Sequence, residues 1–271
     1  MLTYRSIDPV AIQFGPIKIH WYGLLYLIAF VGCYLLVRYR AIKQPETRPI
    51  EPVQISDLAY YCGLGVILGG RLGYCLFYEP SLFIEFDRQL PWWGVFMIHK
   101  GGMSFHGGLI GLMLGVWYMA HKLGRPFFEL MDFAAPATPF GLLCGRIGNY
   151  INGELWGRAT DVPWAMVFPQ VDSIPRHPSM VYEAFLEGIV LWAILWWYSA
   201  KPRPRMAVSG LFGVGYGSFR FLVEFVRQPD AHIGFIAMNW VTMGHLLSLP
   251  MILIGVAMMI MAYRNQRLNP A

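Results

Sequence analysis

Arginine and glutamate side chains recur inside long apolar stretches of this sequence, at spacings that gather them on helix faces. Arg146 and Asn149 are three residues apart, and Tyr216, Arg220 and Glu224 follow one another at intervals of four. Side chains at these intervals share one face of a helix. The planar guanidinium group of arginine matches the geometry of phosphate. The two faces therefore predict a binding site for a phosphate-like anion.

Three further apolar stretches carry a polar side chain close to one end, namely Tyr22, His106 and Glu183. His106 is followed by Gly107 and Gly108, which leave one side of its ring open to a ligand. An imidazole titrates near neutral pH, so His106 is a candidate general base. A buried structural histidine is the alternative.

Ion pairing inside the protein is the alternative role for some of these charges. Arg220 and Glu224 could form a pair along one helix, and Arg71 and Glu183 could satisfy each other between helices. Arg146 has no carboxylate three or four residues away, which favours a ligand-facing role.

Residues 146–157 read RIGNYINGELWG and follow directly on an apolar stretch. Two asparagines, three glycines and Glu154 do not suit a helix that continues in lipid. We expect a turn whose backbone and amide donors face the membrane interface, with an ordinary loop as the alternative.

The composition explains why these charges are informative. Hydrophobic residues form 56% of the 271 residues and charged residues only 14%, whereas soluble domains carry about 25% charged residues. A soluble enzyme and a disordered protein are therefore excluded. No run of Lys and Arg resembles a nucleic-acid groove, so no nucleic-acid partner is expected.

Seven apolar stretches are long enough to cross a bilayer, which takes about 20 residues. We predict an all-α polytopic membrane protein, a single bundle over residues 1–271 with short interfacial elements on the outer side. Glycines four residues apart, as at Gly65 and Gly69 or Gly107 and Gly111, predict close helix packing. The predicted spans are 19–37, 58–78, 101–120, 130–150, 180–200, 207–225 and 238–262.

The basic residues predict the orientation. Eleven of the 21 Lys and Arg residues lie in connections that are inside if the N-terminus is outside, and seven lie in the longer outside connections. We therefore expect the N-terminus outside and the C-terminus in the cytoplasm. Asp132, at the inner end of the fourth span, is assigned a topological role together with the basic residues of the connections. The segment 79–100 is expected to lie at the outer interface.

In this orientation the candidate site residues all lie near the outer leaflet. A channel or carrier needs a polar path across the membrane or at its midplane, which the sequence lacks. An intramembrane protease needs a Ser/His or paired Asp arrangement at one depth, which is also missing. The pattern favours a cavity open to the outer leaflet.

The motifs together resemble the prolipoprotein diacylglyceryl transferase family of bacterial membrane enzymes. The twelve residues 146–157 are the most specific part of the resemblance. The other matching segments are 20–23 (HWYG), 101–108 (GGMSFHGG), 176–179 (RHPS), 182–184 (YEA), 216–220 (YGSFR) with Glu224, and 227–230 (RQPD).

The resemblance implies a reaction at the membrane surface. The diacylglyceryl group of phosphatidylglycerol moves to the thiol of a lipobox cysteine in a prolipoprotein signal peptide, forming a thioether and releasing glycerol phosphate. The implied location is the bacterial inner membrane, with the active site facing the outer leaflet. No metal-ligand constellation is visible, and the reaction needs no cofactor.

The resemblance also implies roles for the site residues. Arg146 and Arg220 would clamp the phosphate, and Glu154 and Glu224 would orient these arginines or the glycerol hydroxyls. His106 is the candidate base, with Tyr22 or a glutamate as alternatives. The implied catalytic residues are His106, Arg146, Arg220, Tyr22, Asn149 and Glu154, and the implied substrate-binding residues are Arg146, Arg220, Glu224, Gly157, Glu183, Tyr216 and Gly107.

Overall fold

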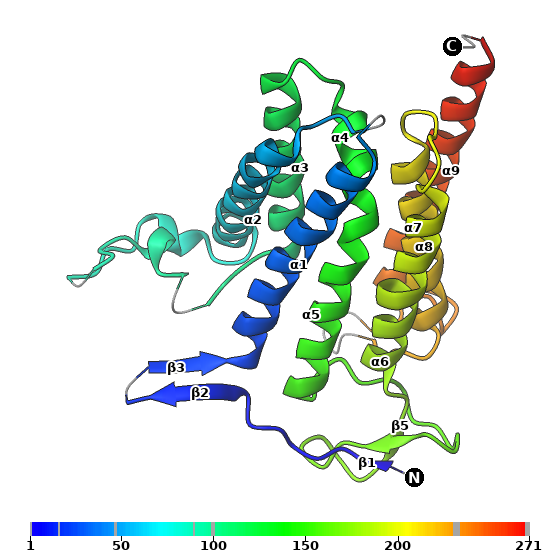
Figure 1. Cartoon of the computed structure of the whole chain (residues 1–271). Coiled ribbons are helices and arrows are strands. Elements are labelled where there is room, and N and C mark those ends of the chain that lie inside the picture. The colour runs from blue at the N-terminus through cyan, green and yellow to red at the C-terminus, as the bar shows by residue number, and fades with distance from the viewer. Residues whose placement is uncertain are drawn as a thin grey trace. The chain divides into compact units, whose positions relative to one another are not determined.

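The computed structural model describes residues 2–15, 17–45, 48–88, 90–98, 101–229 and 234–268. Lys100 and Asp230, which belong to the patterns above, lie outside these residues. The chain forms two compact units (Figure 1). Unit 1 comprises Met1–Val37 and Asp132–Ala271, and unit 2 comprises Arg38–Met131.

Each predicted span coincides with a helix or a run of helices, which confirms a mostly helical protein. Among the described residues, three helical segments are long and apolar enough to cross a membrane, Trp21–Lys43, Ser179–Tyr198 and Met243–Leu268. The helices are α1 (Trp21–Lys43), α2 (Ile55–Phe77), α3 (Phe105–Lys122), α4 (Phe127–Ala134), α5 (Thr138–Asn152), α6 (Ser179–Glu183), α7 (Leu191–Tyr198), α8 (Ala207–Glu224) and α9 (Met243–Leu268).

Short irregular turns join some of these helices into longer rods. The 3-10 turn η5 (Ala135–Ala137) separates α4 from α5, where Pro136 and Pro139 lack the N–H that a continuous α-helix needs. The π-helical segment η6 (Ala184–Val190) joins α6 to α7. Such π segments are rare and occur frequently at functional sites.

In unit 2 the glycine stripes bring α2 and α3 into backbone contact, as their spacing predicts. A Cβ atom on Gly65 would overlap the carbonyl group of Gly111, and one on Gly107 would overlap the carbonyl group of Gly69. Only residues without a side chain allow this approach. Gly107, predicted to bind substrate, thus has a packing role in the structure.

Asp132 has a different role from the topological one predicted for it. Its carboxylate accepts hydrogen bonds from the backbone N–H of Met206 at 2.6 Å and of Ser209 at 2.8 Å, and from the Ser209 hydroxyl at 2.6 Å. These donors lie at the start of α8, where the backbone N–H groups have no partner within the helix. Asp132 therefore caps α8 from a neighbouring helix.

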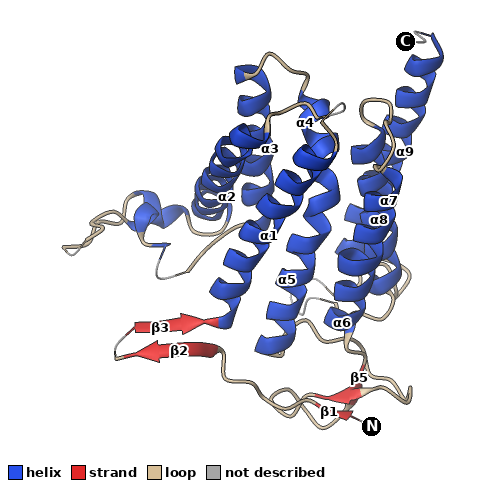
Figure 2. Ribbon diagram, viewed as in Figure 1, coloured by secondary structure: helices blue, strands red, loops and turns tan. Residues whose placement is uncertain are grey.

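Unit 1 also contains short strands, which were not predicted (Figure 2). Strand β4 (Met166–Val167) pairs in parallel with β1 (Leu2–Thr3) and antiparallel with β5 (Pro175–Arg176). A hairpin is formed by β2 (Val10–Phe14) and β3 (Ile17–His20). A small core under the three-stranded sheet contains Tyr4, Met166, Phe168 and Met180.

Candidate functional site

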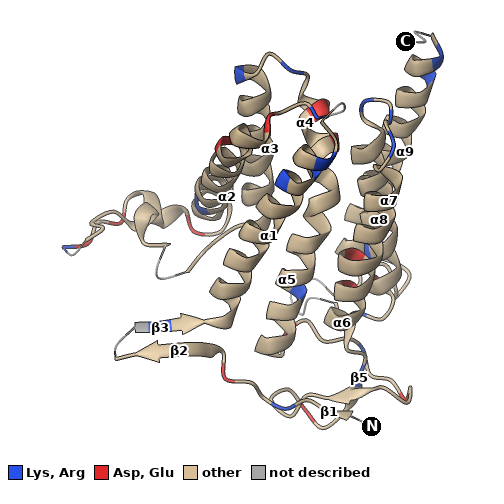
Figure 3. Cartoon of the chain, in the orientation of Figure 1, with Lys and Arg blue, Asp and Glu red and all other residues tan. Residues whose placement is uncertain are grey.

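Six charged residues in unit 1 form a network of ion pairs that we call the arginine–glutamate cluster. Figure 3 shows charged residues at helix ends and in loops, and a few along the helices of unit 1 as well. Helix α5 packs against α6 and η6, and α8 packs against both as well. The cluster comprises Arg146 of α5, Glu183 of α6, Glu187 of η6, Arg220 and Glu224 of α8, and Arg227 just after α8.

Glu183 is the hub of the cluster. Its Oε2 lies 3.0 Å from Nη1 of Arg146, and its Oε1 lies 2.9 Å from Nη1 of Arg220 and 3.1 Å from Nη1 of Arg227. The side chain is completely buried. A buried carboxylate is tolerated only when charge partners compensate for its lost hydration, and three arginines do so here.

Arg146 is ion-paired, although no carboxylate lies near it on its own helix. Besides Glu183, it contacts Oε2 of Glu187 through Nη2 at 3.1 Å and through Nε at 3.4 Å. Both carboxylates come from a neighbouring rod, so the spacing along α5 could not reveal them. The alternative of an Arg71–Glu183 pair was wrong, because each residue has other partners.

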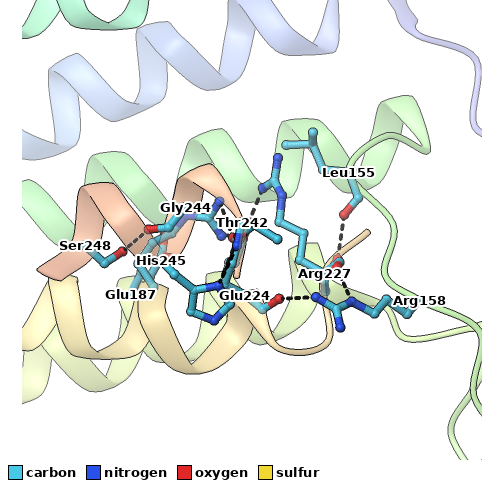
Figure 4. Close-up of polar contacts among 12 residues, drawn as sticks. Leu155, Arg158, Glu187, Glu224, Arg227, Thr242, Gly244, His245 and Ser248 are labelled. Carbon is cyan, nitrogen blue, oxygen red and sulfur yellow. Dashed lines mark hydrogen bonds and ion pairs between the residues drawn. The ribbon is translucent and has the colours of Figure 1, made fainter. Parts of the chain in front are cut away.

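Arg220 and Glu224 form the ion pair that their spacing offered as an alternative role, with 2.7 Å between Nη2 and Oε2. The other carboxylate oxygen, Oε1, accepts a hydrogen bond from the Thr242 hydroxyl at 2.7 Å. Arg158 donates to the backbone carbonyls of Glu224 at 3.2 Å and of Arg227 at 2.9 Å (Figure 4). A second layer of polar contacts therefore surrounds this pair.

The arginines of the cluster are partly accessible and the glutamates are not. The side chains of Arg146 and Arg220 are 17% and 16% exposed, whereas those of Glu183 and Glu187 are 0% exposed. The arginine side chains are thus the more accessible part of the cluster.

Asn149 and Glu154 lie together at the C-terminal end of α5. The Asn149 amide donates to Oε1 of Glu154 at 2.8 Å, and the Asn152 amide donates to the same oxygen at 3.3 Å. Helix α5 ends at Asn152, and the predicted turn begins at Gly153, which caps the helix with φ 65°. The Tyr22 ring packs against Gly148, and its hydroxyl lies 3.5 Å from that of Tyr26.

Gly157 and Tyr216 lie in tightly packed surroundings in unit 1. The Gly157 N–H donates to the His177 carbonyl at 2.8 Å, and a Cβ on Gly157 would lie 2.5 Å from the carbonyl oxygen of Val226. The Tyr216 ring stacks on Phe212 at 5.9 Å and packs against the core that contains Leu191. Burial lowers the pKa of the His177 imidazole, which favours its neutral form.

The remaining predicted residues lie in unit 2. His106 is exposed in the first turn of α3, where its ring meets that of Phe105 edge to face. Arg71 is buried and donates to the backbone carbonyls of Gly94, Val95, Gly101 and Gly102 at 2.6 to 3.0 Å. Arg71 therefore fixes the chain before α3.

Three residues in or next to the arginine–glutamate cluster were not assigned to the site from the sequence. Glu187 follows Glu183 by four residues, and Arg227 follows Glu224 by three, so helical spacing offered a signal for both. Thr242 belongs to a segment beyond α8 with no such spacing. Only the folded chain brings it to Glu224.

The fold and the site together define a polytopic membrane protein in which partly accessible arginines are ion-paired to buried glutamates. The family model of prolipoprotein diacylglyceryl transferases matches residues 9–261. The phosphatidylglycerol–prolipoprotein diacylglyceryl transferase of Methylococcus capsulatus is 53% identical over 98% of this chain and 99% of its own length. The transferase of the same name from Azotobacter vinelandii is 55% identical over 98% of both chains.

A third relative of that name, from Pseudomonas aeruginosa strain LESB58, is 53% identical over the full chain and 99% of its own length. The chain belongs to the prolipoprotein diacylglyceryl transferase family. With its apolar helices, family membership makes it a protein of the bacterial inner membrane.

Proposed function

We propose that this chain transfers the diacylglyceryl group of phosphatidylglycerol to prolipoproteins at the arginine–glutamate cluster. Its relatives, at 53–55% identity over nearly the whole chain, carry the name of this reaction. The observation that supports the place of the reaction is the pair of partly exposed arginine side chains, Arg146 and Arg220, anchored on one buried carboxylate.

The hydrogen-bonding capacity of these arginines supports phosphate binding. A guanidinium group offers five N–H donors. Among the described residues, the ion pairs of Arg220 engage Nη1 and Nη2 once each, and those of Arg146 engage Nη1, Nη2 and Nε. Both groups therefore retain donors for the oxygens of a phosphodiester. The glutamates hold them in a fixed orientation, which lowers the entropy that binding must overcome.

The reaction forms a bond between the cysteine sulfur and the glyceryl carbon and breaks the bond between that carbon and the phosphate oxygen. Glycerol phosphate departs with the bonding electron pair, and the arginines stabilise its charge in the transition state. The thiol becomes the attacking thiolate by losing its proton. His106 is the candidate acceptor, with Tyr22 or a glutamate as alternatives.

The same proposal includes the remaining predicted roles. Asn149, Glu154 and Gly157 shape the site of the lipid head group, and Tyr216 and Gly107 support it. The acceptor is the lipobox cysteine of a signal peptide, which reaches the site from the outer leaflet.

The topology that we propose has seven spans in one bundle over residues 1–271, with the N-terminus outside and the C-terminus in the cytoplasm. Strand β1 and the C-terminal end of α9, both in unit 1, lie at opposite ends of its helices (Figure 1). The basic loop after α7 lies next to α9 near its C-terminus, because the hydroxyls of Tyr198 and Tyr263 are 2.6 Å apart. Both features support a basic cytoplasmic end.

The experiment is a transfer assay with the purified protein, phosphatidylglycerol micelles and a lipobox peptide. We expect a peptide mass gain of one diacylglyceryl group together with released glycerol phosphate. Arg146→Gln should lose about tenfold or more activity, because a charge-assisted hydrogen bond contributes about 1.5–3 kcal/mol. Arg203→Gln is the matched control, since Arg203 stacks on Tyr198 at 4.3 Å. Full activity in Arg146→Gln would refute the proposed site.

A further inference from the structure

We infer that Thr242 is a positioning residue for the transfer reaction, acting through Glu224 on the phosphate-binding Arg220. This inference rests on the proposed function. The Thr242 hydroxyl donates to Oε1 of Glu224 at 2.7 Å, and Oε2 of the same carboxylate lies 2.7 Å from Nη2 of Arg220. The two oxygens of Glu224 thus link the hydroxyl to the guanidinium group.

The two inner parts of this link, Thr242 and Glu224, are shielded from solvent, so their geometry is well fixed. Thr242 is 2% exposed and Glu224 is 3% exposed. A hydrogen bond to a charged group in such surroundings is stronger than one in water. Loss of the hydroxyl would leave Glu224 Oε1 without this donor and free the carboxylate to rotate about its side-chain torsions.

The beginning of α9 is shaped to receive the carboxylate. A Cβ atom on Gly244 would overlap the carboxylate group of Glu224, so only glycine allows the close approach. The N-terminal end of a helix carries partial positive charge, which favours the ionised carboxylate there. The carboxylate of Glu224 therefore contacts both Thr242 and Gly244 (Figure 4).

His245 holds Thr242 in place from the other side. Its Nδ1 lies 3.0 Å from the Thr242 hydroxyl and 3.2 Å from the Thr242 backbone nitrogen. The imidazole is 3% exposed and meets the rings of Phe221 and Phe225 edge to face at 4.7 Å. The aromatic contacts fix the ring, and the ring fixes the threonine.

The test compares three variants in the transfer assay, with lipid and peptide concentrations varied separately. Thr242→Val keeps the shape of the side chain and removes the hydroxyl. Gly244→Ala displaces the Glu224 carboxylate and leaves Thr242 intact. Ser248→Ala is the matched control, because the Ser248 hydroxyl is equally buried in α9 and its hydrogen bond, at 2.7 Å to the Gly244 carbonyl, involves no charged side chain of the cluster.

We expect Thr242→Val and Gly244→Ala each to lower kcat/KM for phosphatidylglycerol by about tenfold, with the KM for the peptide unchanged. Ser248→Ala should keep its lipid kinetics, and Thr242→Ser should restore those of the wild type. A merely structural role would lower the folded fraction of the protein and leave the lipid and peptide parameters of the folded part unchanged.

Equal lipid kinetics in Thr242→Val and Ser248→Ala would overturn the inference, as would failure of Thr242→Ser to restore activity. If Thr242→Val does not fold, Gly244→Ala alone tests the inference. This variant should fold, because alanine favours helix formation more than glycine does. An inactive wild type would instead refute the proposed function, so the two failures are distinguishable.

Discussion

Glu183→Gln is the substitution that should damage the cluster most. Glutamine has nearly the same shape as glutamate, so the packing around the side chain is kept while its charge is lost. Three guanidinium groups lie at 2.9 to 3.1 Å from the carboxylate. In the variant, one end of the amide is an NH₂ group that faces N–H donors, so at least one arginine loses its acceptor.

The magnitude follows from the burial of the hub. Breaking a buried ion pair by removing one partner costs about 3–5 kcal/mol, since it leaves an uncompensated charge. Arg146 keeps Glu187 and Arg220 keeps Glu224, which limits the damage at these two residues. Arg227 keeps no carboxylate within the cluster. We therefore expect the free energy of unfolding to fall by about 3–5 kcal/mol.

Glu187→Gln is the matched control for this prediction. Glu187 is as buried as Glu183, but it contacts only Arg146 within the cluster, and its Oε1 has no hydrogen-bond partner among the described residues. Its replacement should cost about 1–3 kcal/mol. Reversible unfolding in mixed detergent micelles gives both values, and the transfer assay gives the activity of the folded fraction. A larger loss in Glu187→Gln than in Glu183→Gln would refute the assignment of the hub.

Further predictions concern four other places in the chain. Arg146→Lys should lower kcat/KM by about tenfold, measured in the transfer assay, because an ammonium group cannot bridge two carboxylates and still present a planar fork. Asp132→Ala should lower the free energy of unfolding by about 1–2 kcal/mol through the lost cap of α8, with unchanged activity of the folded fraction. Gly111→Leu should separate α2 from α3, which proteolysis of the purified variant would report. Since burial lowers the pKa of His177, the unfolded state binds its proton more readily. Thermal stability should therefore fall as the pH drops through about 6.5, and less so in His177→Gln.

The helices were predictable because apolar length and glycine spacing are local properties of the sequence. The rod from 127 to 152 coincides with the predicted fourth span, although its two prolines divide it into α4, η5 and α5. The short strands were missed because they have two to five residues and depend on contacts between distant segments, as between Leu2 and Met166. No periodic pattern can develop over such lengths.

For the site, helical spacing offered the Arg220–Glu224 pair as an alternative to a ligand-facing role, and the structure contains this pair on one helix. The same reasoning failed for Arg146, whose carboxylates come from another rod. Asp132 was misjudged for the same reason, since its partners follow it by more than 70 residues. Pairings between helices depend on how the helices pack, and a single sequence does not encode that packing in a local pattern.

The central claim is that the phosphate of phosphatidylglycerol binds to Arg146 and Arg220. The most direct test is an experimental structure of the protein in nanodiscs that contain phosphatidylglycerol. We predict that phosphate oxygens lie about 3 Å from guanidinium nitrogens of both arginines, while Glu183 keeps its contacts with them. A lipid phosphate bound elsewhere, with both arginines contacting only glutamates, would contradict the claim.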